Sequence, residues 1–327
     1  MKKDDFKEIL CDTKLILPPL TRYTDYPYRK ILARFNPYFI STEMVNARAV
    51  IEKNPKTLQM LKIEGGNHFK GSQLVGNDPT EMKQAAVFLE KMGFDYIDIN
   101  LGCTVKKVVS KGQGIALMKD ETLTCEIVDA VSNAVKIPVT VKMRTGYSES
   151  RKNAVSLSKK IENVGASAIT VHGRSGEKKF GIKLDYNTIL KVSNSVLIPV
   201  IANGSINSKN AKEVLEKTKA SAVMPGRSVI GNPWIIPEIY CTLSDKKYDK
   251  PKLKEVKNLV IDHVDNLIQF YGEFSGIRQL RKVLPKYFSS CKHINKLKFD
   301  VNSVESKNDV EMLIDRIKNK EGFWMYC

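Results

Sequence analysis

The first 240 residues alternate short apolar segments with longer amphipathic ones, and this alternation restricts the fold more than any other feature. The short segments are mostly β-branched and are predicted to be buried parallel strands; they cover residues 14–17, 38–43, 71–75, 96–100, 139–144, 168–172, 199–202 and 222–224. Helical stretches lie between them, for example 79–92, 121–135, 152–164 and 208–218. Eight strands joined by helical crossovers predict an α/β fold, a (β/α)8 TIM barrel. A doubly wound sheet would instead need a glycine-rich turn after the first strand, where this chain has Pro18 and Pro19.

The composition changes after residue 243, where a polar linker spans residues 244–251. Apolar residues then recur at helical spacing, and further helical stretches are predicted near 277–290 and 303–318. We therefore expect two domains, a barrel at 1–243 and a small helical domain at 244–327. The second domain is basic, with a set of cations at Lys252, Lys254, Lys257, Arg278, Arg281, Lys282 and Lys286.

The 327 residues carry a formal net charge of +17. An excess of this size favours a polyanionic partner, nucleic acid first, although a lysine-rich solvated surface is the alternative. No apolar run is long enough to span a bilayer and no signal core follows the N-terminus, so a cytoplasmic protein is expected. The six cysteines form no C-x-x-C pair, so neither a metal site nor a disulfide framework is expected.

The catalytic end of a barrel lies at the carboxyl ends of its strands, and polar residues and glycines gather there in this chain. Gly204 and Gly226 follow the seventh and eighth predicted strands, where barrels often bind phosphate, and Arg227 adds a fork-shaped donor. The alternative is that both glycines only permit tight turns. Lys142 ends an apolar strand, so it either reaches a ligand anion or extends to the rim.

Two further side chains at this end have the chemistry of catalytic groups. His172 could be a ligand-facing donor or a core histidine, and the adjacent Gly173 and Arg174 favour the former. Cys103 follows Gly102 in a loop and could serve as a general acid, because an ordinary thiol is mostly protonated at neutral pH. Nearby lysines could instead favour a thiolate or attract nucleic-acid phosphate.

These motifs together resemble the tRNA-dihydrouridine synthase family, most closely its broad bacterial branch. The resemblance covers about residues 14–240 and rests on an ordered set of segments: 42–45 (TEMV), 98–103 (DINLGC), 105–109 (VKKVV), 141–146 (VKMRTG), 171–174 (VHGR), 203–204 (NG), 226–227 (GR) and 231–234 (GNPW). It is weaker in the tail, where 277–282 (IRQLRK) is similar to the family's helical domain.

The resemblance implies an oxidoreductase with a flavoprotein barrel that binds FMN, uses NADPH or NADH as electron donor, and reduces uridine in tRNA to dihydrouridine. It also implies a helical tRNA-binding domain, and we expect a monomer. Cys103 would protonate C5 of the uracil after hydride reaches C6, Asn100 would orient the base, and Arg174 would contact flavin or RNA. The flavin site would comprise Pro18, Pro19 and Leu20 as lining, Gln73 and Lys142 at the ring, and His172, Asn203, Gly204, Ser205, Gly226 and Arg227 at the ribityl phosphate end.

Three positions depart from the family pattern. Thr104 stands where proline is usual after the cysteine, and Ser205 where aspartate is usual. The first loop, 18–22, reads PPLTR where APMAG is usual, so Arg22 replaces a glycine. Two other functions stay open, the first opposed by the net charge and the basic tail, the second suggested by these departures. One is an FMN barrel oxidoreductase for a small molecule, similar to dihydroorotate dehydrogenases or ene-reductases; the other is an RNA-binding protein without redox activity.

Overall fold

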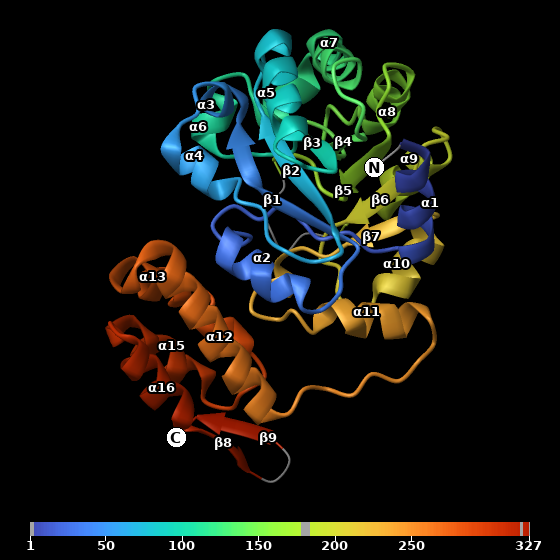
Figure 1. Cartoon of the computed structure of the whole chain (residues 1–327). Helices are drawn as coiled ribbons and strands as arrows, with labels where there is room; N and C mark the ends of the chain where they lie inside the picture. Colours follow the sequence, from blue (N-terminus) through green and yellow to red (C-terminus); the bar gives the residue numbers. More distant parts are fainter. Residues whose placement is uncertain (1–2, 178–183, 321–322, 327) are drawn as a thin grey trace.

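A parallel barrel forms the first part of the chain in the computed structural model, which describes residues 3–177, 184–320 and 323–326 (Figure 1). Neighbouring strands pair in parallel in the order of the chain. Within the described residues these strands are β1 (Phe39–Asn46), β2 (Phe69–Val75), β3 (Tyr96–Leu101), β4 (Val139–Arg144), β5 (Ala168–His172), β6 (Val200–Asn203) and β7 (Ala222–Met224). The predicted α/β barrel class is thus confirmed, and the strand positions match to within a few residues.

The segment predicted as the first strand closes the barrel between β7 and β1. Ile16 donates its backbone N–H to Val223 O at 3.2 Å, and Leu17 donates to Phe39 O at 3.2 Å. Only Leu15 forms a ladder bridge, so the segment is shorter than the predicted strand. Pro18 and Pro19 explain this difference, because they have no N–H with which to extend the ladder.

Helices surround the sheet and bury their apolar faces against it (Figure 1). Three aspartates fix helix starts: Asp78, Asp120 and Asp185 each accept a backbone N–H in the first turn of α5, α7 and α9. The surrounding helices are α2 (Tyr26–Ala33), α3 (Ala47–Ile51), α4 (Pro55–Met60), α5 (Pro79–Lys91), α7 (Glu121–Ser132), α8 (Ala154–Asn163), α9 (Tyr186–Ser193), α10 (Ala211–Thr218) and α11 (Ile235–Leu243).

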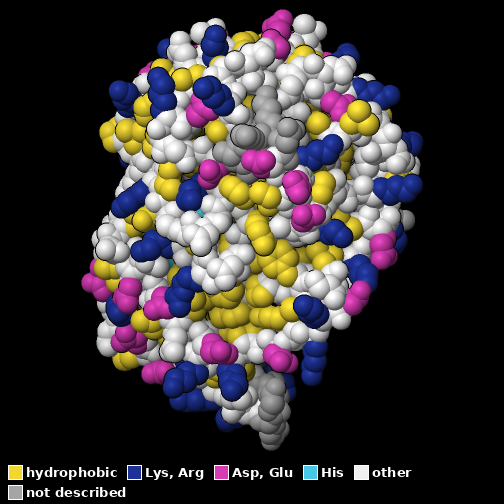
Figure 2. Space-filling view, turned by 45° about the vertical axis from the view of Figure 1, so that its right-hand side comes forward, with side chains coloured by type: hydrophobic (Ala, Val, Ile, Leu, Met, Phe, Trp, Pro, Cys, Tyr) yellow, Lys and Arg dark blue, Asp and Glu magenta, His cyan; other side chains and the backbone are white. Residues whose placement is uncertain are grey.

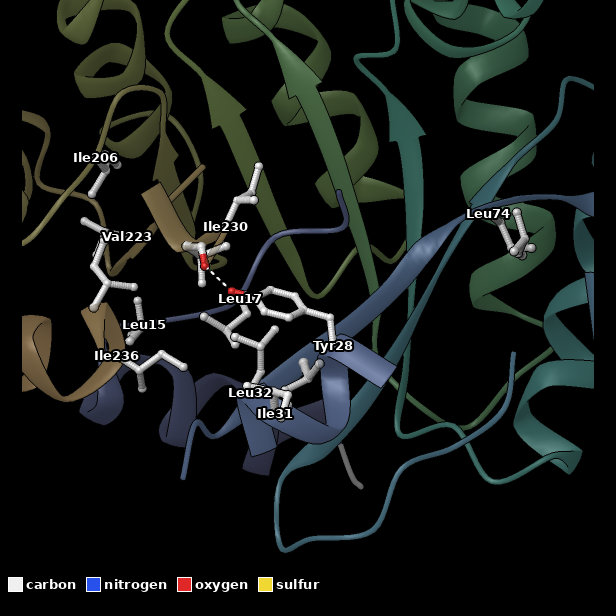
Figure 3. Packing of buried hydrophobic residues seen from close by; sticks show 14 of the residues in the cluster. Leu15, Leu17, Tyr28, Ile31, Leu32, Leu74, Ile206, Val223, Ile230 and Ile236 are labelled. Atoms are coloured by element: carbon white, nitrogen blue, oxygen red, sulfur yellow. Dashed lines mark hydrogen bonds between the residues drawn. The ribbon is translucent and has the colours of Figure 1, made fainter. Parts of the chain in front are cut away.

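The barrel interior changes from apolar to polar along the strands. Near the strand starts, Phe39, Tyr96 and Ile201 pack with Phe6 and Leu10 of α1 (Lys3–Thr13), a helix that the sequence analysis did not predict. Figure 3 shows the neighbouring core, where Leu17 lies beside Tyr28 of α2 and Leu15 lies beside Val223. Because this end is filled by apolar side chains, a ligand can enter the barrel only from the carboxyl ends of the strands.

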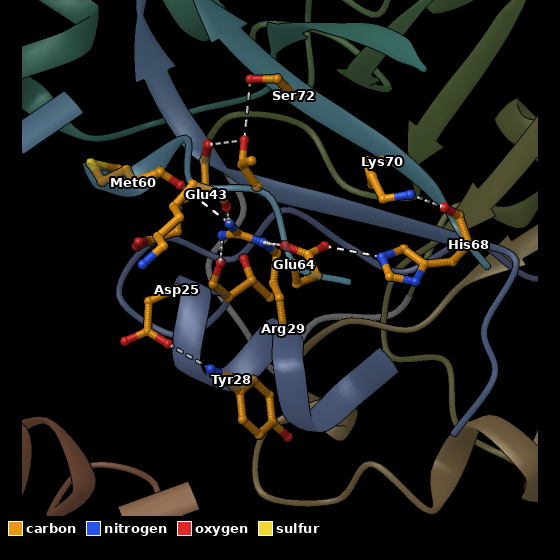
Figure 4. A network of polar contacts seen from close by, with 12 residues as sticks. Asp25, Tyr28, Arg29, Glu43, Met60, Glu64, His68, Lys70 and Ser72 are labelled. Carbon is orange, nitrogen blue, oxygen red and sulfur yellow. Dashed lines mark hydrogen bonds and ion pairs between the residues drawn. The ribbon is translucent and has the colours of Figure 1, made fainter. Parts of the chain in front are cut away.

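A buried ion pair anchors α2 beneath the first loop (Figure 4). Arg29, 1% exposed, donates from Nε to Glu64 Oε2 at 2.7 Å and from Nη1 to Thr24 O at 2.8 Å. Burial opposes the charge of Glu64, but its hydrogen bond with His68 and the Arg29 charge outweigh burial and hold its pKa below the ordinary value. A buried pair with such complete hydrogen bonding fixes geometry, so the loop at 18–24 has a rigid base.

The tail is mainly helical, with α12 (Leu253–Tyr271), α13 (Glu273–Leu280), α14 (Leu284–Tyr287), α15 (Ile294–Asp300) and α16 (Lys307–Asp315). It also contains an antiparallel hairpin, β8 (Ile317–Lys320) with β9 (Phe323–Tyr326), which the helical prediction missed. None of the described helices has the length and apolarity to cross a bilayer.

The tail packs against the barrel through α12 and α2 (Figure 1). The Tyr26 and Phe270 rings lie 5.1 Å apart, and Arg34 pairs with Asp262 at 2.5 Å. The Tyr271 hydroxyl also donates to Asp25 at 3.2 Å. These contacts place the basic loops of the tail beside the first barrel loop.

Candidate active site

A cavity of about 560 Å³ opens at the carboxyl ends of the strands. Predicted site residues form most of its wall: Pro18, Pro19, Leu20, Lys142, His172, Arg174, Asn203, Gly204, Ser205, Gly226 and Arg227. Lys286 of the tail also lines it, and the sequence analysis had given that lysine no part in this site. The cavity therefore lies between the barrel and the helical domain.

Strand register brings these side chains together. Asn100 of β3 pairs with Lys142 of β4, and His172 of β5 pairs with Asn203 of β6. The Lys142 Nζ donates to Asn203 Oδ1 at 3.1 Å, and Asn203 Nδ2 donates to Met224 O at 2.8 Å. Burial lowers the pKa of Lys142 to about 8, so the lysine is mostly charged at neutral pH but held in a site that disfavours the charge.

His172 is a neutral donor or acceptor surrounded by cations. Burial is the main cause that lowers its pKa to about 2, and the charges of Lys142, Arg144, Arg174 and Arg227 lower it further. Its Nδ1 is buried and has no hydrogen-bond partner among the described residues. A neutral imidazole with an unused nitrogen, inside a ring of cations, suits an anionic ligand with additional polar atoms.

Two glycines line this cavity, and they serve different purposes: Gly226 exposes its backbone and Gly204 permits close packing. A Cβ added at Gly226 would meet no atom within 4 Å, so the backbone faces open space. Gly204 has a φ of 125°, and a Cβ there would lie 2.6 Å from Leu184 Cδ2. The next residue, Ser205, accepts a hydrogen bond from Arg174 Nη2 at 3.2 Å, in place of the charge pair that an aspartate would make.

A chain of hydrogen bonds runs from the barrel interior to the cysteine loop. Gln73 Nε2 donates to Asp98 Oδ2 at 2.6 Å, and Asn100 Nδ2 donates to Gln73 Oε1 at 2.8 Å. Asn100 Oδ1 then accepts the backbone N–H groups of Gly102 and Cys103, at 3.1 and 2.9 Å. Gln73 and Asn100, which do not line the cavity described above, are thus placed to hold the loop that carries Cys103.

Two residues without a predicted role support this arrangement. Arg144 donates from Nε to Gly102 O at 2.9 Å and from Nη1 to Ser175 O at 2.9 Å. Asp98 accepts from Thr140 Oγ1 at 2.7 Å, and burial raises its pKa to about 6. Each is a polar residue in a largely apolar buried strand, and this pattern in the sequence could have indicated a role for both.

The cysteine loop is also closely packed. Ile115 donates its N–H to Cys103 O at 3.0 Å, and Gly114 has a φ of 62°. A Cβ at Gly114 would lie 3.0 Å from the Cys103 Cβ, so a glycine is needed here for the close packing of the loop. Thr104 lines a second cavity of about 440 Å³ on the other side of the loop.

The family model described as dihydrouridine synthase matches residues 16–321. The chain belongs to this family. A probable tRNA-dihydrouridine synthase of Rickettsia bellii is 37% identical over 94% of this chain and 93% of its own length. The tRNA-dihydrouridine synthases B of Vibrio parahaemolyticus and Pseudomonas aeruginosa are 37% and 35% identical over 89% of this chain, and over 91% and 89% of their own lengths.

Solved structures of low sequence identity share the fold of this dihydrouridine synthase family member. Morphinone reductase aligns with a TM-score of 0.50 at 14% identity over 74% of this chain and 88% of its own length. The 6-hydroxypseudooxynicotine amine oxidase of Pseudomonas geniculata aligns with a TM-score of 0.54 at 13% identity, over 71% of this chain and 47% of its own length.

Within the described residues, no group of three or more histidine, cysteine or acidic side chains is arranged to hold a metal ion.

Proposed function

We propose that this chain reduces uridine in tRNA to 5,6-dihydrouridine, with non-covalently bound FMN and with NADPH or NADH as the electron donor. The observation that carries the proposal is the cationic cavity at the strand ends, where His172 keeps an unused buried nitrogen. Membership of the dihydrouridine synthase family supports the same reaction.

The residues present fit FMN. Gly226 offers a backbone cradle without a Cβ, and Arg227 offers charged donors to a phosphate, with Asn203, Gly204, Ser205 and His172 beside them. Pro18, Pro19 and Leu20 form the apolar wall for the ring. When bound, FMN supplies the hydride that the uracil receives. Lys142 would place a buried cation beside the ring, where it would stabilise negative charge. Gln73, the other predicted ring contact, would act from behind the cavity wall, because it holds Asp98 and Asn100.

Cys103 is the proposed proton donor, and the loop around it supports that role. Addition of a hydride at C6 leaves negative charge at C5, which must receive one proton. The backbone N–H of Cys103 is held by Asn100 and its carbonyl by Ile115, so the main chain that carries the thiol is fixed. Asn100 acts on the substrate mainly through this loop, because Oδ1 already accepts two hydrogen bonds. Arg174 remains the proposed contact to flavin or RNA.

The helical tail is the proposed RNA-binding domain. Lys286 lines the cavity. Burial raises the pKa of Asp25 and Glu43, and the charge of Lys282 opposes that rise in part, so Lys282 lies near the first loop. Figure 2 shows, however, that Lys and Arg alternate with Asp and Glu over this face, so net charge alone does not locate the RNA. The cations nearest the cavity mouth are therefore the ones assigned to tRNA phosphates.

Mass spectrometry of tRNA from a strain that lacks the gene tests this function. Loss of dihydrouridine at one or more positions, restored by the intact gene and not by a Cys103→Ala gene, is the expected result. The purified protein should also be yellow and release FMN on denaturation. A full complement of dihydrouridine in the deletion strain, together with a colourless protein that binds no added FMN, would contradict the proposal.

A further inference from the structure

Arg22 combines an unfavourable backbone conformation with an exposed cationic side chain at the rim of the cavity. Its φ is 72°, in the left-handed region that glycine adopts most easily. The turn is otherwise well made, since Leu20 O accepts the N–H groups of both Tyr23 and Thr24 at 2.9 Å. The buried Glu43 accepts the N–H of Arg22 itself. The structure thus holds a strained arginine firmly in place.

The position of Arg22 links it to the active site. Pro18, Pro19 and Leu20 line the cavity, and the turn that Leu20 closes has Arg22 at its outer tip. No hydrogen bond or ion pair of the Arg22 guanidinium is found among the residues that the structure describes, and the residue is exposed. The tail contributes Lys282 near this loop: burial raises the pKa of Asp25 and Glu43, which Figure 4 shows beneath the loop, and the Lys282 charge opposes that rise in part.

Strain at one residue persists where the side chain has a function that a less strained residue lacks. Arginine is suited to bind phosphate, because its guanidinium donates several hydrogen bonds in a planar fork. We propose that Arg22 is a substrate-binding residue whose guanidinium contacts a backbone phosphate of tRNA next to the uridine that enters the cavity. The proposal rests on the proposed function and adds a contact from the barrel loop to those assigned to the tail.

The test uses the full-length holoenzyme with an unmodified tRNA transcript, and measures tRNA affinity across a salt series. Arg22→Gly is the main variant, since glycine accepts the left-handed turn and the fold is retained. It should bind tRNA about tenfold more weakly at low salt, and the slope of log affinity against log salt should fall by about one. Arg22→Lys keeps the charge and should keep most of the slope.

Lys219→Gly is the matched control. Lys219 is also an exposed cation with a positive φ, 50°, but it ends α10 just before β7, at the opposite end of the barrel. Its replacement removes the same charge and the same kind of strain, so it should leave tRNA affinity and the salt slope unchanged. Equal weakening by Lys219→Gly and Arg22→Gly would show that only net charge matters and would overturn the assignment.

The remaining outcomes separate this proposal from the proposed function. A wild-type protein that forms dihydrouridine, with an Arg22→Gly variant of equal tRNA affinity and slope, would refute the role of Arg22 alone. Loss of FMN from Arg22→Gly would mean that the residue supports the cofactor and would also refute it. A wild-type protein that neither binds tRNA nor forms dihydrouridine would refute the proposed function itself.

Discussion

Asp98 is a buried acid whose replacement by asparagine should raise stability and impair the active site. Its carboxylate accepts hydrogen bonds from Gln73 and Thr140, yet burial raises its pKa to about 6 from the ordinary 3.8. The folded state therefore binds the proton more tightly than the unfolded state. The protonated Asp98 side chain contributes fully to the free energy of unfolding below pH 3.8, and this contribution is lost as the pH rises to about 6.

The size of the effect follows from the two pKa values. A difference of about two pH units corresponds to about 3 kcal/mol at neutral pH, using about 1.4 kcal/mol for each unit. Asp98→Asn keeps the shape and removes the charge: its carbonyl can accept from Gln73 and its NH2 can donate to the Thr140 hydroxyl. We expect the free energy of unfolding to rise by up to about 3 kcal/mol at pH 7.5.

The same change should weaken function through Lys142. The Asp98 charge raises the pKa of Lys142 against the larger effect of burial, which lowers it to about 8. Without that carboxylate the Lys142 pKa must fall further, so the lysine loses its proton at a lower pH. The rate at which NADPH bleaches the bound flavin should then decline from a lower pH in Asp98→Asn than in the wild type.

Urea unfolding at pH 5 and pH 7.5, and stopped-flow absorbance over a pH series, measure these two effects. Asp129→Asn is the control, because Asp129 is exposed on α7 and the change is chemically the same. It should leave both measurements near wild type. Two results together would refute the assignment of Asp98 as an ionised partner of Lys142. The Asp98→Asn protein would have unchanged stability at pH 7.5, and its rate of flavin bleaching would decline with rising pH as the wild-type rate does.

The remaining predictions concern single steps of the proposed function. Cys103→Ala should keep FMN and NADPH oxidation but form dihydrouridine about 10²–10⁴-fold more slowly; wild-type product formation would show that the proton comes from another group. Arg227→Ala should lower FMN occupancy after dialysis, read from the flavin absorbance, because a charge-assisted phosphate contact is lost. Thr104→Pro should be tolerated in the same product assay, since no described residue accepts a hydrogen bond from the Thr104 N–H. Reversing the charges of Arg278 and Lys282 should weaken tRNA binding in a filter assay and spare FMN content.

The sequence was sufficient for the strand order and for the residues at the strand ends. Apolar β-branched runs are buried wherever they occur in a barrel, and a parallel register places their carboxyl ends side by side. Lys142, His172 and Asn203 could therefore be grouped in advance, although their proposed roles still require the experiments above. The two glycines predicted to bind phosphate line the cavity by the same rule, because Gly204 directly follows β6 and Gly226 lies two residues after β7.

Features that depend on tertiary contacts could not be predicted in this way. Arg281 was included among the basic residues of the tail, but its guanidinium donates twice to Val304 O, at 2.9 and 2.6 Å. It holds the tail together, so the RNA-binding test above omits it. The strain at Arg22 and the fixing of the Cys103 loop by Asn100 likewise depend on backbone geometry that composition and spacing do not show.

The distribution of charge around the barrel axis suits the proposed binding of an anionic cofactor and a polyanionic substrate at one site. Below the cavity, Asp98 stabilises the charged form of Lys142, while none of the described residues that line the cavity carries a carboxylate. Ser205 keeps this imbalance, because its hydroxyl accepts from Arg174 without neutralising it. His172 remains neutral in this setting, because burial lowers its pKa and the neighbouring cations lower it further. An anion bound among these groups would offset their mutual repulsion, so FMN should stabilise the fold most strongly at low salt.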